Sequence, residues 1–433
     1  MLATNSMVER VLLVGGGGRE HAIARAVAAD CELFGCASNQ NPGIAALTSE
    51  FRIVDETAPE EILEMAVDVD ATLAVIGPES ALEAGVADRL DEAGVYTFGP
   101  RAAEARIETD KAYQREFMQA EAISGCPDFE TFETADAAAD YVRQYDADVA
   151  VKPRGLTGGK GVRVTGDQVT QSEAVKYVRE AGFDEWVVEE RLVGEEFTIQ
   201  AFVADGTVES TPAVQDHKRA YDGDEGPNTG GMGSYSAAGR TLPFMTDADY
   251  EAAVRILEET VEALPAYKGV LYGQFMLTAD GPKVVEFNAR FGDPEAMNTL
   301  PALETPLIEI LTAARDEDSL PDVTFSGAAT VCKYAVPDGY PTNPSAGARI
   351  EVDENAAGEA LLFYASVEAR ETGLYTTGSR AYAVVGNGAE ISEAEQEAET
   401  ALGSSSESIR VRHDIGTAES IQQRIDHMNR LRE

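Results

Sequence analysis

Short apolar runs alternate with helical segments through the first hundred residues, and this alternation constrains the fold more than any other feature. The runs VLLVGG, CELFGCA, ATLAVIGP and VYTFGP have strand character, and segments such as REHAIARAVAA and ESALEAGVADRLDEAG have helical periodicity. Strands separated by about ten to fifteen helical residues predict right-handed βαβ units on a parallel sheet. We therefore expect a Rossmann-like N-terminal domain over residues 7–108.

The turn GGGGREH after the first strand resembles a dinucleotide fingerprint, but neither register of G-x-G-x-x-G has its third glycine. Glu20 or His21 stands at that position, so the turn gives little support to NAD binding or to a dehydrogenase. A ligand is still expected at the carboxyl ends of the strands, where GGGGREH, ASNQNPG and IGPES meet. A helix N-terminus with Arg19 beside it suits a phosphate monoester.

The stretch VKPRGLTGGKGVRV, residues 151–164, joins two strand-like runs through a glycine-rich loop. A P-loop requires a glycine six residues before the lysine and Ser or Thr after it, and Arg154 and Gly161 occupy those positions. The alternation after the loop predicts a hairpin. Its four glycines leave backbone N–H groups open to a phosphate; an ordinary hairpin loop is the alternative that these residues alone leave open.

The chain is strongly acidic, with 77 Asp and Glu against 34 Lys and Arg and a formal net charge of -43. Such a field disfavours binding to nucleic acid or to anionic lipid. Because the acidic residues are spread along the chain, we expect a halophilic protein that stays soluble in a very salty cytoplasm. Only eight lysines occur, and half of them lie in segments of interest: Lys111, Lys152, Lys160 and Lys218.

The cysteines and the hydropathy indicate the compartment. Cys31, Cys36, Cys126 and Cys332 lack CxxC spacing, which predicts free thiols in a reducing compartment. No apolar run reaches the length of about eighteen residues that a membrane helix needs. We expect a cytoplasmic protein without a membrane partner.

Two further segments frame the second half of the chain. Residues 216–236, DHKRAYDGDEGPNTGGMGSYS, form a polar, glycine-rich stretch that we interpret as a binding loop or lid. A helix over 246–264 then leads to two strands, and the last hundred residues predict mixed strands with two helices and no concentrated motif.

The strand VVEFNAR carries Glu286, Asn288 and Arg290 at a spacing of two, so all three should share one face of a sheet. Glu and Asn offer hard oxygen ligands that suit Mg²⁺ on nucleotide phosphates, and Arg290 could bind a transferring phosphoryl group. A solvent-facing polar strand is the simpler alternative.

The segment VVEERLVGEEF could hold an adenosine. Glu189 could accept a hydrogen bond from the adenine amino group, the backbone near Leu192 could contact the ring edge, and Glu196 could bind the ribose hydroxyls. Taken alone, an acidic turn on an acidic protein explains the segment equally well.

Together these motifs resemble the ATP-grasp superfamily and, within it, the phosphoribosylamine-glycine ligase family. The resemblance runs from VLLVGGGGREHA through NPG, GPE, DKAYQREFM, GLTGGKGV and VVEERLVGEEF to its two most specific segments, QDHKRAYDGDEGPNTGGMGSYS and VVEFNARFGDPE. It implies an α/β and α+β multidomain fold. An ATP-grasp domain over 109–326, with a glycine-rich hairpin lid in a subdomain of about 126–193, would follow the first domain, and a small mixed α/β domain over 327–433 would complete the chain.

The resemblance also implies roles for individual residues. Lys111 and Lys152 would contact ATP phosphates under a lid formed by Gly158, Gly159, Lys160 and Gly161, while Glu189, Leu192 and Glu196 would hold adenosine. Glu286 and Asn288 would bind Mg²⁺ or Mn²⁺. The catalytic group would be Asp216, His217, Lys218 and Arg290; of these, Asp216, Lys218 and Arg290 would border the glycine and sugar-phosphate end, and Gly17, Arg19 and Glu79 would contact phosphoribosylamine.

The implied reaction joins glycine to 5-phosphoribosylamine through a glycyl phosphate, in a chain expected to be a monomer. Another ATP-grasp carboxylate-amine ligase and a non-catalytic nucleotide-binding protein are the alternatives. Two positions depart from the family pattern: Arg154 replaces an aspartate, and Gln274 replaces a carboxylate found in many ATP-grasp enzymes. His217 could position the loop or transfer a proton, His21 would shape the first turn, and His413 and His427 are expected at the surface.

Overall fold

The computed structural model describes residues 8–156, 161–352, 358–403 and 408–433. Its N-terminal part consists of β1 (Arg10–Val14), α1 (Gly18–Val27), β2 (Glu32–Ala37), α2 (Pro42–Leu47), β3 (Glu50–Ile53), α3 (Pro59–Asp68), β4 (Leu73–Ile76), α4 (Glu79–Glu83), α5 (Val86–Glu92) and β5 (Tyr96–Phe98). The five strands are parallel in the order β3-β2-β1-β4-β5. This order reverses direction beside β1, as in a Rossmann-like sheet, so the fold expected for this part is confirmed.

Two details of this sheet differ from the sequence interpretation. The short elements α2 and β3 were not expected, because neither is long enough to give a clear periodicity. The segment ESALEAGVADRLDEAG is two helices rather than one, since Gly85 adopts a left-handed backbone (φ 81°) between α4 and α5.

The next part is a small subdomain that follows α6 (Ala102–Thr109) and α7 (Lys111–Ala120). It contains β6 (Phe129–Phe132), α8 (Ala135–Gln144), β7 (Val149–Pro153), β8 (Arg163–Val164), α9 (Gln171–Glu180) and β9 (Trp186–Glu190), with the strand order β6-β9-β7-β8. Buried Trp186 joins a small core of its own with side chains of α8 and α9. The expected hairpin is confirmed, because β7 and β8 pair antiparallel with Ala150 opposite Val164; its tip, 157–160, lies outside the described residues.

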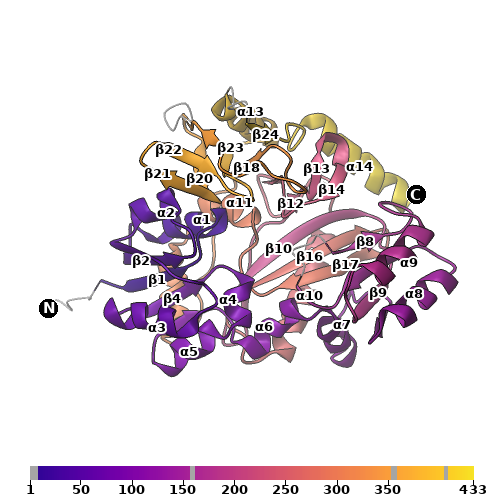
Figure 1. The fold of residues 1–433 in the computed structure, drawn as a ribbon, viewed down its shortest axis with the longest axis horizontal. Coiled ribbons are helices and arrows are strands. Elements are labelled where there is room, and N and C mark those ends of the chain that lie inside the picture. The colour runs from indigo at the N-terminus through magenta and orange to yellow at the C-terminus, as the bar shows by residue number, and fades with distance from the viewer. Residues whose placement is uncertain (1–7, 157–160, 353–357, 404–407) are drawn as a thin grey trace.

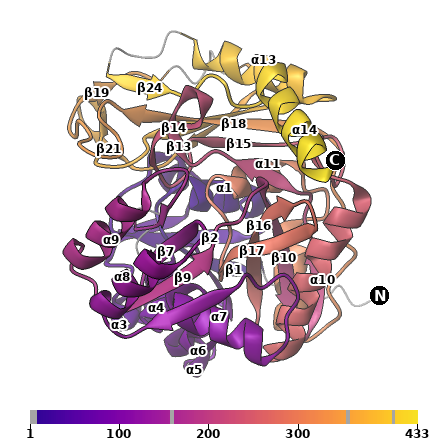
Figure 2. The same cartoon turned by 90° about the vertical axis from the view of Figure 1, so that its right-hand side faces the viewer.

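The largest sheet crosses the middle of the molecule (Figures 1 and 2). It begins with β10 (Glu195–Ala204), β11 (Thr207–Ser210), β12 (Val214–Asp216), β15 (Gly233–Ser236), β16 (Gly269–Thr278) and β17 (Gly281–Asn288), and its helices are α10 (Asp247–Ala263), α11 (Glu295–Ala302) and α12 (Leu307–Arg315). Thr246 caps α10 as its side chain accepts from Asp249 N. The predicted helix over 246–264 and the two strands after it are therefore confirmed.

The expected loop over 216–236 is instead mostly regular structure. It holds the end of β12, a hairpin of β13 (Arg219–Tyr221) and β14 (Glu225–Asn228) around the turn η1 (Asp222–Asp224), and strand β15. The polar, glycine-rich composition concealed β15, whose four residues are buried between β12 and β18 (Ala329–Pro337). A buried strand at this position fixes both flanking segments against the site.

The C-terminal part continues the same sheet with some of its strands and forms a separate three-stranded sheet with others. Its remaining elements are β19 (Arg349–Ile350), β20 (Leu361–Tyr364), β21 (Val367–Arg370), β22 (Gly373–Thr376), β23 (Tyr382–Gly388), α13 (Ile391–Leu402), β24 (Ile409–Val411) and α14 (Ala418–Arg432). The sheet order β17-β16-β10-β12-β15-β18-β23-β20 passes from the central part into this one through β15 and β18. The separate sheet has the order β19-β22-β21. The two expected helices are α13 and α14, and no helix in the described ranges is long and apolar enough to cross a membrane.

Candidate active site

Glu286 and Asn288 lie on β17; Glu286 lines the candidate cavity, whereas Asn288 is buried at the end of the strand. The register of β17 against β16 shifts between Gln274 and Phe275, so Gln274 pairs with Glu286 while Val285 is the extra residue of a bulge. Val285 therefore lines the cavity instead of packing in the core. Burial alone would raise the pKa of Glu286, but Lys218, Lys111, Lys152 and Arg290 lower it to about 2. An anionic carboxylate two residues from an amide oxygen suits a hard cation.

Lys218 and Gln274 join this strand to its neighbours. The Lys218 Nζ atom donates to Gln274 Oε1 and lies 3.7 Å from Glu286 Oε1, and Gln274 Nε2 donates to Glu196 Oε2 over 2.6 Å. Gln274, the departure from the family pattern, thus bridges a lysine and a glutamate. An amide can donate and accept at once, whereas a carboxylate only accepts.

Lys152 and Glu189 form a buried charge cluster with Arg115 of α7. The Glu189 carboxylate lies 2.7 Å from Lys152 Nζ and takes two hydrogen bonds from Arg115, at 2.8 and 3.2 Å. Arg115 and Lys152 also donate to the Val285 carbonyl. Both Glu189 oxygens are therefore engaged, and an adenine amino group would have to share them; the side chain acts here as the support of Lys152.

The base of the glycine-rich hairpin is tied to the start of α7. Arg154, the second departure, makes two 2.8 Å hydrogen bonds to the Asp110 carboxylate, which also caps α7. Lys111 Nζ donates to the Gly155 carbonyl over 2.7 Å. Among the predicted lid residues, Gly161 is described, whereas Gly158, Gly159 and Lys160 lie outside the described residues.

The N-terminal sheet contributes a second set of predicted residues. Gly17 precedes α1 and its N–H donates to Glu20, while Arg19 bonds Glu20 and the Phe291 carbonyl. Arg290 lies just beyond β17, not within it, and its guanidinium is 3.4 Å from Glu79. The structure thus brings Arg19, Glu79 and Arg290 together.

Asp216 and His217 differ from these paired groups. Both are buried, and neither Asp216 Oδ1 nor the two ring nitrogens of His217 has a hydrogen-bond partner among the described residues. Burial, opposed by Lys218, raises the pKa of Asp216 to about 8. Burial lowers the pKa of His217 to about 3, so its imidazole is neutral.

A cavity of about 460 Å³ connects most of these groups. Its wall includes the following predicted residues: Lys152, Glu189, Leu192, Glu196, Asp216, His217, Lys218 and Glu286. His427 was expected at the surface; its side chain is 33% exposed, and it also lines this cavity and bonds Glu195. His413 is mostly exposed, as expected, and His21 is buried, where it accepts from Tyr364 N.

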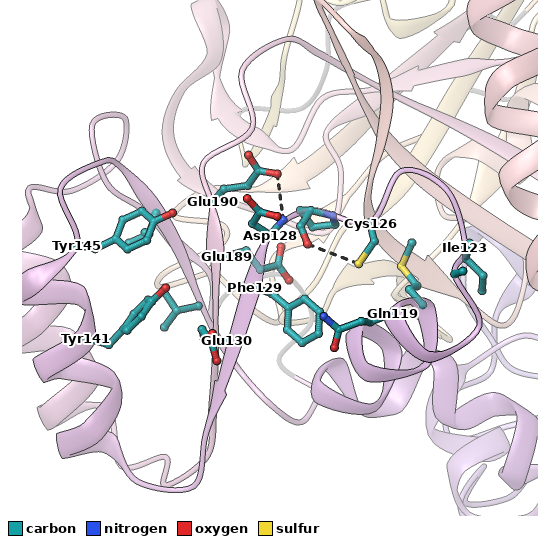
Figure 3. Close-up of a pocket in the computed structure, with 15 residues that line it drawn as sticks. Gln119, Ile123, Cys126, Asp128, Phe129, Glu130, Tyr141, Tyr145, Glu189 and Glu190 are labelled. Carbon is teal, nitrogen blue, oxygen red and sulfur yellow. Dashed lines mark hydrogen bonds between the residues drawn. The ribbon is translucent and has the colours of Figure 1, made fainter.

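A second cavity, of about 500 Å³, also borders β9, and Figure 3 shows residues of its wall. Asp128, Glu130, Glu189 and Glu190 contribute to its wall, and none of the described lining residues is lysine or arginine. A triphosphate there would meet carboxylates and no lysine or arginine of the described wall. The first cavity is therefore the candidate nucleotide site.

Sequence reasoning missed Arg115 and Glu108, two residues that hold the site together. Glu108 is buried, lies 2.8 Å from Arg290 Nη2 and accepts from Ala289 N over 2.6 Å. Glu108 lies on α6 and Arg115 on α7, and a charged residue on a surface helix normally faces solvent. The sequence held one signal for these two residues, because Arg115 falls within the family segment DKAYQREFM.

Comparison with known proteins agrees with this geometry. Three family models match in order along the chain: the phosphoribosylglycinamide synthetase N domain over residues 9–108, its ATP-grasp (A) domain over 109–296 and its C domain over 330–418. The phosphoribosylamine-glycine ligase of Methanosarcina acetivorans is 52% identical over 98% of each chain, and that of Methanopyrus kandleri is 48% identical over 98% of this chain and 99% of its own.

Solved structures give the same result. The crystal structure of the phosphoribosylamine-glycine ligase of Thermotoga maritima covers 94% of this chain and all of its own, with a TM-score of 0.79 and 27% identity. The biotin carboxylase domain of a 2-oxoglutarate carboxylase from Hydrogenobacter thermophilus covers 98% of this chain and 94% of its own, with a TM-score of 0.72 and 15% identity, which is a likeness of fold alone. By the ordered match of all three domain models and by its curated relatives, this chain belongs to the phosphoribosylglycinamide synthetase family.

Proposed function

We propose that the protein is an ATP-dependent ligase that joins glycine to 5-phosphoribosylamine, giving glycinamide ribonucleotide, ADP and phosphate in purine biosynthesis. One observation carries this: a single cavity joins an anionic Glu286 to several cations, beside the Arg290–Glu79 contact with the N-terminal sheet. The relatives at about half identity carry the name of this activity. We further propose a cytoplasmic monomer.

ATP would lie with its adenosine between β9 and β10 and its phosphates toward β17. The backbone near Leu192 would contact the adenine and Glu196 the ribose, since both line the cavity beside Met276. Lys111 and Lys152 would contact the phosphates. The hairpin residues Gly158, Gly159, Lys160 and Gly161 would close over them, because the three glycines have no side chains to shield their backbone N–H groups from a phosphate and the lysine adds a positive charge.

Glu286 and Asn288 fit a magnesium ion. Mg²⁺ is usually held by one or two carboxylates together with substrate phosphates, not by a full protein cage. Among the described residues no cluster of three His, Cys, Asp or Glu is suited to a metal, so substrate phosphates would have to complete the coordination. When bound, the ion would neutralise charge on the phosphates during transfer. The related carboxylase domain was crystallised with ADP and its magnesium salt.

The chain's own residues would position three substrates in two steps. A glycine carboxylate oxygen attacks the γ-phosphorus and ADP leaves, which forms glycyl phosphate. Lys218 and Arg290 could offset the negative charges of the glycine carboxylate and of the γ-phosphate. The amine of phosphoribosylamine then attacks the acyl carbon, phosphate leaves with the bridging oxygen, and the nitrogen loses a proton. No protein nucleophile is needed, so positioning supplies much of the rate.

The phosphoribosylamine would bind at the N-terminal sheet. Gly17 stands at the start of α1, where backbone N–H groups favour a phosphate, and Arg19 and Glu79 lie at the carboxyl ends of β1 and β4. Asp216, His217 and Lys218 would border glycine. The boundaries 7–108, 109–326 and 327–433, with a lid of about 126–193, remain our division of the chain.

The test is ADP release at molar KCl with each substrate omitted in turn. We expect turnover only when ATP, glycine and phosphoribosylamine are all present. Equal ADP release with D-alanine and without phosphoribosylamine would contradict the proposal and favour another ATP-grasp carboxylate-amine ligase.

A further inference from the structure

Helix α14 reaches the candidate nucleotide cavity from the C-terminal end of the chain. Arg424 and His427, one turn apart on this helix, line the same cavity as Leu192 and Glu196. The family model for the C domain ends at residue 418, where α14 begins. The helix therefore adds to the cavity wall beyond the part that the family match covers.

His427 contacts the strand that follows the adenosine-binding segment. Its Nδ1 lies 2.6 Å from Glu195 Oε1, and Glu195 is buried at the first position of β10. The next residue is Glu196, proposed to bind the ribose. Gln215 of β12 supports the same two residues. Its Nε2 donates to the Glu196 carbonyl over 3.0 Å and lies 3.5 Å from Glu195 Oε2.

Arg424 fixes the opposite wall as well. Its Nε is 3.5 Å from Glu195 Oε2, and its Nη2 pairs with Asp224 in the turn η1. Asp224 is held in addition by Arg412 over 2.7 Å. One helix thus neutralises two carboxylates that border the cavity, and it links β10 to the β13–β14 hairpin.

The docking of α14 does not depend on these two side chains alone. Met428 is buried in the core, and Ile421, Ile425 and Leu431 pack against it. At its last turn Arg432 makes a 2.8 Å ion pair with Asp249 of α10. Removing the His427 ring should therefore leave the helix in place.

We propose that α14 is part of the nucleotide site, with His427 and Arg424 as positioning residues that act through Glu195. They hold the first residues of strand β10, so that Glu196 and the backbone near Leu192 keep the geometry that adenosine needs. This inference rests on the proposed function, because it takes the cavity to be the ATP site.

The test compares His427→Leu with His427→Asn, whose amide can donate to Glu195 from near the position of Nδ1. We expect His427→Leu to weaken ADP binding by calorimetry and to raise KM for ATP, each by about tenfold, the effect of losing one hydrogen bond to a charged group. The value of kcat at saturating ATP, KM for glycine and the melting temperature should change little. His427→Asn should recover most of the affinity.

Two controls separate positioning from general loosening. His413→Leu removes a matched histidine–glutamate contact, between His413 and Glu399, neither of which lines the cavity. Arg432→Ala loosens the same helix without touching the cavity. Both should bind ADP as the wild type does. If His427→Leu does not fold, Arg424→Lys decides the question by the same calorimetric measurement, with a loss of several-fold expected.

ADP affinity equal to wild type in His427→Leu, or in Arg424→Lys where that variant is used, would overturn the inference. An equal loss in Arg432→Ala would overturn it too, since helix docking would then explain the effect. A wild-type protein that binds no ADP would instead overturn the proposed function itself.

Discussion

Two groups of residues in the cavity wall hold their charges in different ways. In the paired group, Lys152 is paired with Glu189, and Lys218 contacts Gln274 and Glu286. In the unpaired group, Asp216 and His217 are buried with polar atoms that find no partner within the described part of the chain. Paired charges hold their positions before a substrate arrives, whereas a buried unpaired group costs free energy until a ligand supplies a partner. We propose that the paired group positions the substrates and that a substrate supplies the missing partners of the unpaired group.

The largest effect on turnover should follow from Glu286→Gln, which changes a contact of the paired group. The variant keeps the size of the side chain but removes the charge that faces Lys218 and the proposed metal ion, so turnover should fall by about 10³-fold, equivalent to about 4 kcal/mol. The melting temperature should change little, because this side chain is not fully enclosed. Steady-state rates over a magnesium titration measure the effect.

Glu368→Gln, at an exposed ion pair with Arg370, is the matched control and should keep full activity. Wild-type turnover of Glu286→Gln at limiting Mg²⁺ would show that the carboxylate does not hold the metal.

The residues of this site also show what the sequence could and could not predict. Glu286 and Asn288 are two residues apart on one strand, so their shared face follows from strand geometry. The Arg115–Glu189 and Glu108–Arg290 pairs join residues far apart in the chain, and local periodicity carries no information about such contacts. The role of α14 was missed for the same reason, and β15 was missed because a four-residue polar strand looks like a loop.

Glu189→Gln should have the next largest effect, on stability. Arg115 and Lys152 would stay buried with less compensating charge, so the free energy of unfolding should fall by about 3 kcal/mol. Denaturant unfolding at fixed KCl measures it. A change below about 0.5 kcal/mol, the size typical of surface substitutions, would mean that the cluster is not a strong support.

Asp216, in the unpaired group, should make the stability of the protein depend on pH. The raised pKa of Asp216, about 8, means that the folded state keeps a proton which the unfolded chain releases near pH 4. Its contribution to stability is therefore full below about pH 4 and is lost as the pH rises toward 8.

Asp216→Asn should remove this dependence. As the pH rises from 5 to 8, the melting temperature of the variant should therefore rise relative to that of the wild type. Parallel melting curves over that range would show that Asp216 is ionised in the folded protein without substrate.

Changing the salt concentration should affect the paired contacts least, because it acts through the net charge of the whole molecule and not on any single contact. With a net charge of -43 the folded chain repels itself, and the screening length grows from about 3 Å at 1 M salt to about 30 Å at 0.01 M. Lowering KCl over this range should reduce the melting temperature, and Mg·ATP should restore part of the loss by binding the native state. A melting temperature independent of KCl would contradict the halophilic interpretation of the composition.

The most direct test of the account follows one oxygen atom through the reaction. With glycine labelled with ¹⁸O in its carboxylate, attack on the γ-phosphorus leaves a labelled oxygen between carbon and phosphorus, and amide formation releases it with the phosphate. Mass spectrometry of the inorganic phosphate should therefore find one ¹⁸O for each turnover that depends on phosphoribosylamine. Unlabelled phosphate from a reaction that still forms the amide would contradict a glycyl phosphate, and with it the site described above.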